Sequence, residues 1–120
     1  MKEINKYAAA SLNPIVDEDL IDDNVIRMRM IQNQAINLYA KKNADYGNAF
    51  EKGCDNLGFM YAFSRIWDKT QRFENLAKKY AENENADIRV KDETLNDTIL
   101  DLANYCFMFL SWYGSTTKTL

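Results

Sequence analysis

Acidic side chains recur along the segment 93–113 of this 120-residue chain, at Glu93, Asp97 and Asp101, and Asn104 continues the row. If the segment is a helix, a rotation of about 100° per residue places all four on one side of it. Like charges four residues apart destabilise a helix by roughly 0.2 to 0.5 kcal/mol per pair, which favours a counter-charge or a bound cation. Oxygen ligands without histidine or cysteine are typical of Mg²⁺ or Mn²⁺ sites. The simpler alternative is a solvated acidic face.

Asp101 differs from the other carboxylates because its neighbours in the helix, Tyr105 and Phe107, are aromatic. We therefore expect Asp101 to be partly buried. A buried charge is unfavourable unless it is paired or bound to a metal. Asp101 thus needs a partner more than Glu93 does.

A second polar row lies in the segment 58–82, on the side away from Phe63, Ile66 and Phe73. If the two polar rows face each other, two alternatives are open. In the first, the arginines pair with Asp97 and Asp101 as a structural network. In the second, the carboxylates hold a metal, while the arginines and Lys69 bind phosphate oxygens, to which arginine is matched in shape. The members of the second row are Arg65, Asp68, Arg72, Asn75 and Lys79.

The segment 41–50 places basic, acidic and aromatic side chains around a helix break at Gly47. In a functional interpretation, Tyr46 or Phe50 stacks on a base and a lysine contacts phosphate. In a structural interpretation, Gly47 makes the turn, Asp45 caps it and the aromatic rings fill the core.

The chain contains no histidine and its two cysteines, Cys54 and Cys106, lack CxxC spacing. This excludes histidine acid–base chemistry, Ser-His-Asp triads and the usual zinc sites. We expect both thiols to be buried as small hydrophobic groups.

Three long helices are predicted to position these groups. The first is capped by Asp22 or Asp23 and runs to about Asn43, and a loop with at most one helical turn around Phe50 follows, up to Gly58. The second runs from about Gly58 to the polar residues 82–85, and the third from Glu93, after a cap at Asp92, to about Tyr113. Apolar residues at spacings of three and four are the basis for these helices. In chain order they are Val25, Met28, Ile31, Ala35 and Leu38; Phe59, Ala62, Phe63, Ile66, Trp67, Phe73, Ala77 and Tyr80; and Leu95, Ile99, Leu102, Cys106, Phe109 and Tyr113.

The expected fold is all-α: a small antiparallel bundle of these three helices joined by short turns. Residues 1–20 are expected to form an N-terminal arm and residues 21–115 a single helical nucleotide-binding domain. The second half of the last helix is apolar nearly all round, with Phe107, Met108, Leu110 and Trp112. Three helices do not cover such a surface, so we expect a homo-oligomer with Phe107 and Trp112 in its interface.

The amino-acid composition narrows the range of binding partners that we expect for this chain. The net charge is only −3, with basic and acidic residues interspersed, so the sequence lacks the basic footprint of nucleic-acid binding. No apolar run has the length of a signal peptide or a membrane span, so we expect a cytoplasmic protein with no membrane partner.

Three of these motifs together resemble the nucleotide modification associated domain family of phages and bacteria (first type), over about residues 38–110. The resemblance implies a role near phage or bacterial nucleotide metabolism or base modification, without defining a reaction. The motifs are Lys42-Asn43-x-Asp45-Tyr46-Gly47-x-x-Phe50, then Asp68-Lys69-x-x-Arg72-x-x-Asn75-Leu76, and then Lys91-Asp92-Glu93-x-x-x-Asp97-Thr98-x-x-Asp101-Leu102-Ala103-Asn104-Tyr105.

The carboxylate-rich third helix is also distantly similar to the all-helical MazG-like pyrophosphohydrolases, which cleave a nucleoside triphosphate to a monophosphate and pyrophosphate with Mg²⁺. The sequence departs from that pattern in two ways. Asp97 and Asp101 stand four residues apart rather than three, and the second helix supplies only Asp68 to the site.

The predicted function is nucleotide binding, with Mg²⁺-dependent hydrolysis as its extension; the alternatives are a non-catalytic or sequestering nucleotide-binding protein and a helical assembly module. In the hydrolase hypothesis the metal polarises a phosphoanhydride for attack by water. The predicted catalytic residues are Asp68, Asp97 and Asp101. The predicted metal ligands are Glu93, Asp97 and Asp101. The predicted ligand-binding residues are Lys42, Asp45, Tyr46, Lys69, Arg72, Asn75 and Asn104.

Overall fold

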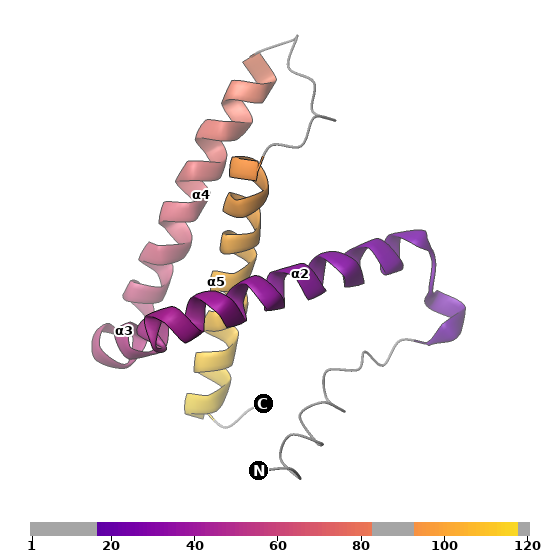
Figure 1. Cartoon of the computed structure of the whole chain (residues 1–120). Coiled ribbons are helices and arrows are strands. Elements are labelled where there is room, and N and C mark those ends of the chain that lie inside the picture. Colours follow the sequence, from indigo (N-terminus) through magenta and orange to yellow (C-terminus); the bar gives the residue numbers. More distant parts are fainter. Residues whose placement is uncertain (1–16, 83–92, 118–120) are drawn as a thin grey trace. The chain divides into compact units, whose positions relative to one another are not determined.

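The computed structural model describes residues 17–82 and 93–117, and these residues form helices and turns without any strand (Figure 1). The all-α prediction is therefore confirmed for this part of the chain. The elements are the 3₁₀ helix η1 (Glu18–Leu20) and the α-helices α2 (Asp23–Tyr46), α3 (Ala49–Leu57), α4 (Phe59–Glu82) and α5 (Glu93–Thr117). The chain divides into two compact units, residues 1–33 and 34–120.

In the first unit, short acidic side chains begin the helices. The Asp17 carboxylate accepts a hydrogen bond from the Asp19 backbone N–H at 3.0 Å. The Asp22 carboxylate accepts one from the Val25 N–H at 2.9 Å, so Asp22 caps α2 as predicted. The expected arm and the expected cap at Asp92 lie outside the described residues, apart from residues 17–20 of the arm.

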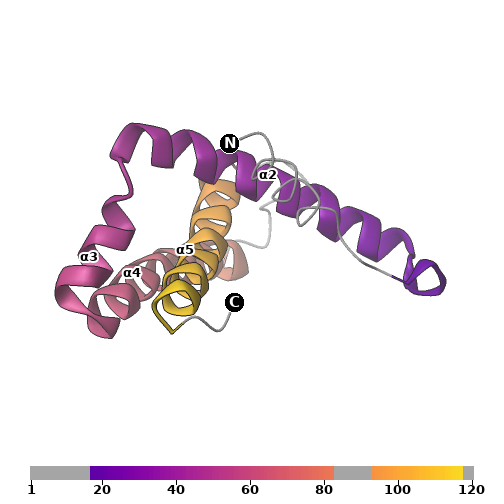
Figure 2. The same cartoon turned by 90° about the horizontal axis from the view of Figure 1, so that it is seen from below.

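The second unit is built on α4 and α5, which lie side by side and run in opposite directions (Figures 1 and 2). The short helix α3 packs against both of them. Its Cys54 is buried with Ala62 of α4 and Trp112 of α5. The indole Nε1 of Trp112 donates a hydrogen bond to the Asp55 carboxylate at 2.8 Å, so the buried ring has its one donor satisfied.

Two consecutive residues with positive φ separate α2 from α3: Gly47 at 58° and Asn48 at 61°. Glycine and asparagine are the residues that most readily adopt this left-handed conformation. The Asn43 side-chain amide donates to the Asn48 side-chain oxygen at 2.7 Å and closes the turn. The motif around Gly47 thus stops one helix and starts another.

The predicted loop between residues 43 and 58 is wrong, because residues 49–57 form α3. Gly47 and Gly58 do end helices, each with positive φ. Gly53, by contrast, lies inside α3, where the ring of Tyr61 occupies the space that a Cβ atom would need. Close approach to Tyr61, and not a turn, accounts for the glycine at this position.

The boundaries of the long helices agree with the prediction to within a few residues, but the predicted buried sides are correct only in part, as for Ala35, Ala62 and Phe109. In α4, Phe63 and Trp67 are exposed, whereas Tyr61, Arg65 and Lys69 are partly buried. In α5, the predicted core residues Ile99, Cys106 and Tyr113 are exposed.

The side of α5 that faces the rest of the unit carries Thr98, Asp101, Asn104, Tyr105 and Trp112. In α5 most of these positions precede the predicted core residues by one residue, or roughly 100° of rotation, whereas in α4 Ala62 and Ile66 of the predicted stripe are buried or partly buried.

Two further predictions need correction. Cys54 is buried as expected, but Cys106 is exposed. Trp112 is only 9% exposed and belongs to this chain's own core rather than to a free surface, while Phe107 is 54% exposed. The homo-oligomer stays a prediction.

None of the helices in the described part of the chain has the length and apolar character needed to cross a membrane.

Candidate functional site

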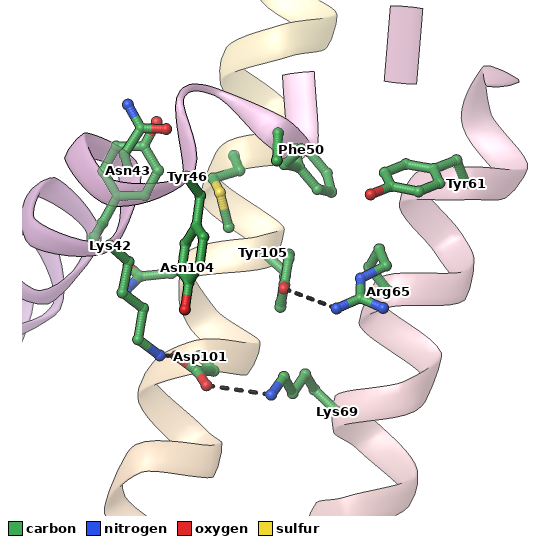
Figure 3. Close-up of a pocket in the computed structure, with 13 residues that line it drawn as sticks. Lys42, Asn43, Tyr46, Phe50, Tyr61, Arg65, Lys69, Asp101, Asn104 and Tyr105 are labelled. Atoms are coloured by element: carbon green, nitrogen blue, oxygen red, sulfur yellow. Dashed lines mark hydrogen bonds and ion pairs between the residues drawn. The ribbon is translucent and has the colours of Figure 1, made fainter. Parts of the chain in front are cut away.

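A pocket of about 390 Å³ lies within the second unit, where the last part of α2 meets α3, α4 and α5. Its lining combines cationic and aromatic side chains with a single carboxylate (Figure 3). The lining residues are Tyr39, Lys42, Asn43 and Tyr46 of α2; Ala49 and Phe50 of α3; Tyr61, Arg65 and Lys69 of α4; and Asp101, Asn104, Tyr105 and Met108 of α5.

The carboxylate of Asp101 is the centre of the polar half of the pocket. One oxygen accepts from Lys42 Nζ at 2.6 Å and the other from Lys69 Nζ at 3.2 Å. The two lysines approach Asp101 from opposite sides (Figure 3). The side chain of Asp101 is only 16% exposed and that of Lys69 21%. Asp101 therefore has the partners that its burial requires, and they are lysines rather than the expected arginines or metal.

Arg65 supplies a third positive charge. Its Nη2 donates to the Tyr105 hydroxyl at 3.2 Å, and its Cζ lies 5.5 Å from the centre of the same ring. The hydrogen bond to Tyr105 raises the pKa of Arg65 above its ordinary value, so the guanidinium remains charged at any physiological pH. Its Nη1 also lies 3.6 Å from an oxygen of the exposed Asp68. Arg65 is thus held at the pocket wall from two sides.

Aromatic rings form the other wall. The ring of Phe50 lies with its centre 6.0 Å from that of Tyr61 and 5.6 Å from that of Tyr105. These separations are typical of favourable tilted ring pairs. The Tyr61 hydroxyl is directed toward the interior of the site (Figure 3). Tyr46, by contrast, is 70% exposed, so much of its ring remains open to solvent.

Asn104 connects two walls of the pocket. It is buried, and its side-chain amide donates to the Ala35 backbone carbonyl of α2 at 3.0 Å. This bond fixes the last part of α2 against α5 and thereby places Lys42 opposite Lys69. We predicted that Asn104 contacts the ligand; in the structure its side-chain amide binds the protein backbone instead.

The structure brings some of the predicted site residues together and leaves others apart. The pocket includes Lys42, Tyr46, Lys69, Asp101 and Asn104. Five others are exposed and do not line it, namely Asp45, Asp68, Arg72, Asn75 and Asp97. Asn75 lies instead in a shallower depression with Lys78, Lys79 and Glu82. The backbone of Glu93 begins α5, and its side chain lies outside the described residues.

Of the three predicted magnesium ligands, the structure describes the side chains of Asp97 and Asp101 but not that of Glu93. No three acidic or sulfur side chains gather to hold a metal anywhere in residues 17–82 and 93–117 whose side chains are described. The pocket itself offers Asp101 alone, and lysine ammonium groups already engage both of its oxygens. A Mg²⁺ ion bound by Asp97, Asp101 and Glu93 stays a prediction without support from this geometry.

Several pocket residues were not predicted, above all Tyr61, Tyr105 and Tyr39. One signal in the sequence was available: Tyr61, Arg65 and Lys69 follow one another at intervals of four, and so do Asp101 and Tyr105. Such spacing places them on one side of each helix. The apolar residues beside them gave a stronger periodic signal on a neighbouring side.

The fold and the pocket define an all-helical protein with a cationic and aromatic cavity. The chain belongs to the nucleotide modification associated domain 1 family, whose model matches residues 42–111. The matched segment contains every pocket residue except Tyr39. No match was found among the curated proteins or among the solved structures, and similarity to MazG-like enzymes is not shown.

Proposed function

We propose that the pocket binds a nucleotide, with the phosphate at Lys42, Lys69 and Arg65 and the base against the aromatic wall. The observation that carries this proposal is the meeting of three cationic side chains and a row of aromatic rings in one cavity. Its volume of about 390 Å³ falls within the range typical of small-ligand sites.

The proposed position of the phosphate is supported by the positive charges of the pocket. Lysine and arginine are the usual protein ligands of phosphate oxygens, and a charge-assisted hydrogen bond is roughly twice as strong as a neutral one. Lys42 and Lys69 both direct their ammonium groups at one point, the Asp101 carboxylate. A phosphate close to this point meets two donors that are already oriented.

The base end is supported by Tyr46 and by the wall of Phe50, Tyr61 and Tyr105. Stacking of a base on an aromatic ring contributes about 1 to 3 kcal/mol and tolerates any base. The ring of Tyr46 lines the pocket and is largely exposed to solvent. It is therefore the ring best suited to cover a bound base.

The test is calorimetric titration of nucleoside mono-, di- and triphosphates into the wild-type protein and Lys69→Met. Loss of one charged hydrogen bond, about 1.5 to 3 kcal/mol, predicts a loss in affinity of about ten- to a hundredfold. Lys78→Met is the matched control, because Lys78 lies on the same helix and pairs only with the exposed Glu74, at 3.0 Å. Equal affinity in Lys69→Met and wild type would contradict the proposal.

Hydrolysis is the second candidate and rests on the predicted carboxylates alone. It is tested in the same samples by measuring pyrophosphate release with Mg²⁺ present. Release that is lost in Asp101→Asn would establish a pyrophosphohydrolase; binding without release would leave a binding or sequestering protein. A role in phage or bacterial nucleotide metabolism, in the cytoplasm and as a homo-oligomer, belongs to the same proposal.

A further inference from the structure

We infer that the pocket selects a nucleoside monophosphate, bound as its dianion without a metal ion, and that Asp101 determines this choice. The inference rests on the proposed function and adds the charge class of the ligand and the residue responsible for it. It is carried by the ion-pair arrangement of Lys42, Lys69, Arg65 and Asp101.

The charge of the pocket is the first step. Three cationic side chains and one carboxylate line it, so the lining carries a net charge of +2, and the carboxylate of Asp68 beside Arg65 is exposed and lies outside the lining. A phosphate monoester has its second pKa near 6, so at pH 7.5 it carries close to two negative charges. A monophosphate therefore neutralises the pocket, whereas each further phosphate group adds negative charge with no matching cation in the lining.

The burial of the pocket residues also favours a monophosphate, because burial raises the free-energy cost of any charge that is not neutralised. The side chains of Asp101 and Lys69 are about four-fifths removed from solvent. At such a site an unmatched charge is screened less than at the open surface, and its loss of hydration is not recovered. The excess anion of a metal-free triphosphate meets this penalty next to the Asp101 carboxylate.

A magnesium ion normally relieves such excess charge on a triphosphate, usually through one or two protein carboxylates. Within this pocket Asp101 is the carboxylate in reach, and both of its oxygens accept from lysines. Capture of a magnesium–triphosphate complex would require these two ion pairs to break. The monophosphate needs no such rearrangement.

Asp101 is thus a specificity-determining residue with a positioning role. It holds the ammonium groups of α2 and α4 at one point, and it subtracts one charge from the three that the cations provide. Asp101→Asn keeps the size of the side chain and raises the net charge of the pocket by one. The variant should accept more highly charged ligands than the wild type does.

The experiment measures dissociation constants for the mono-, di- and triphosphate of one nucleoside, in EDTA at pH 7.5, for wild type and Asp101→Asn. In wild type we expect the monophosphate to bind at least about fivefold more tightly than the triphosphate. In Asp101→Asn we expect the ratio of the two constants to shift toward the triphosphate by about tenfold. The ratio is the readout because a merely structural loss at Asp101 weakens all three ligands alike.

Glu74→Gln is the matched control, since it also converts an ion-paired carboxylate to an amide, but in an exposed pair with Lys78 outside the pocket. Its ratio should equal that of the wild type. If Asp101→Asn does not fold, the wild-type ratio alone still decides the charge class.

Tighter binding of the triphosphate to wild type in EDTA, or binding of any nucleotide only when Mg²⁺ is added, would overturn the inference while leaving nucleotide binding intact. An unchanged ratio in a folded Asp101→Asn would remove the role given to Asp101. If none of the three ligands binds, the proposed function itself fails.

Discussion

Two neighbouring stretches of the α4–α5 pair differ in the side chains that they bring together: aromatic rings in one and ion pairs in the other. Around Trp112, aromatic rings pack against one another: Phe59 lies 5.7 Å from both Trp112 and Phe109 between ring centres, in edge-to-face contacts, and Trp112 is buried although Phe59 is partly open to solvent. Along the same helices, the pocket contains an ion-pair cluster that remains partly open to solvent. The comparison teaches that one helix pair combines a packed aromatic stretch beside α3 with an adjacent charged stretch, which is the binding surface that we propose.

The largest expected effect tests the packed stretch. Trp112→Ala removes a buried ring and leaves the Asp55 carboxylate without its indole donor, so we expect a loss of about 3 to 5 kcal/mol in the free energy of unfolding. Urea unfolding followed by circular dichroism measures it. A loss below about 1 kcal/mol would show that this stretch does not provide the main stability of the unit.

An intermediate effect is expected at Asn104, which is buried and also lines the pocket. Asn104→Ala removes the hydrogen bond to the Ala35 carbonyl, which still accepts from its helical partner in α2, so we expect a loss of about 0.5 to 1.5 kcal/mol in unfolding free energy. Nucleotide affinity should fall as well, since Lys42 is no longer held opposite Lys69. Asn96→Ala, at an exposed position of α5, is the control for helix propensity and should leave both quantities nearly unchanged.

The smallest effect is expected at Arg72, which is exposed and lies outside the pocket. Arg72→Met should change the free energy of unfolding by less than about 0.5 kcal/mol, as is usual for surface substitutions. Nucleotide affinity should also stay within about twofold of wild type. A several-fold loss of affinity in titration would show that the ligand also contacts α4 beyond the pocket. The distinction between the packed stretch and the charged stretch would then no longer hold.

The sequence predicted the helices better than it predicted which sides of them are buried. The spacing of apolar residues and the capping residues locate a helix, and Asp22 caps the start of α2 as expected. The buried side was placed from apolar residues alone, however, whereas Phe63 and Trp67 are exposed and Arg65 and Lys69 turn inward. Long cationic side chains bury their aliphatic stems while keeping the charged end at a polar site. A pattern of hydrophobicity does not distinguish this arrangement from a solvated face.

The sequence predicted which charged residues belong to the candidate site, but it did not predict how they are arranged. Asp101 was expected to be buried beside a counter-charge, and Lys42 and Lys69 were among the expected phosphate ligands. Which cation meets Asp101 depends on how α2 returns toward α5, through contacts such as Asn104 to Ala35, separated by 69 residues. Local sequence patterns carry no information about such a pairing. Tyr46 was among the predicted residues, whereas Tyr39, Tyr61 and Tyr105 were missed because the apolar residues beside them gave the stronger periodic signal.

The glycine inside α3 has a consequence for sequence variation. Alanine is the better helix former by about 1 kcal/mol, so helix propensity alone would favour Gly53→Ala. The methyl group, however, would meet the ring of Tyr61, which forms part of the pocket wall. At position 53, therefore, a gain in local helix stability would displace Tyr61 from its place in the pocket wall. A library of variants at this position, sorted for nucleotide binding, should retain glycine, while one sorted for the helicity of α3 alone should enrich alanine.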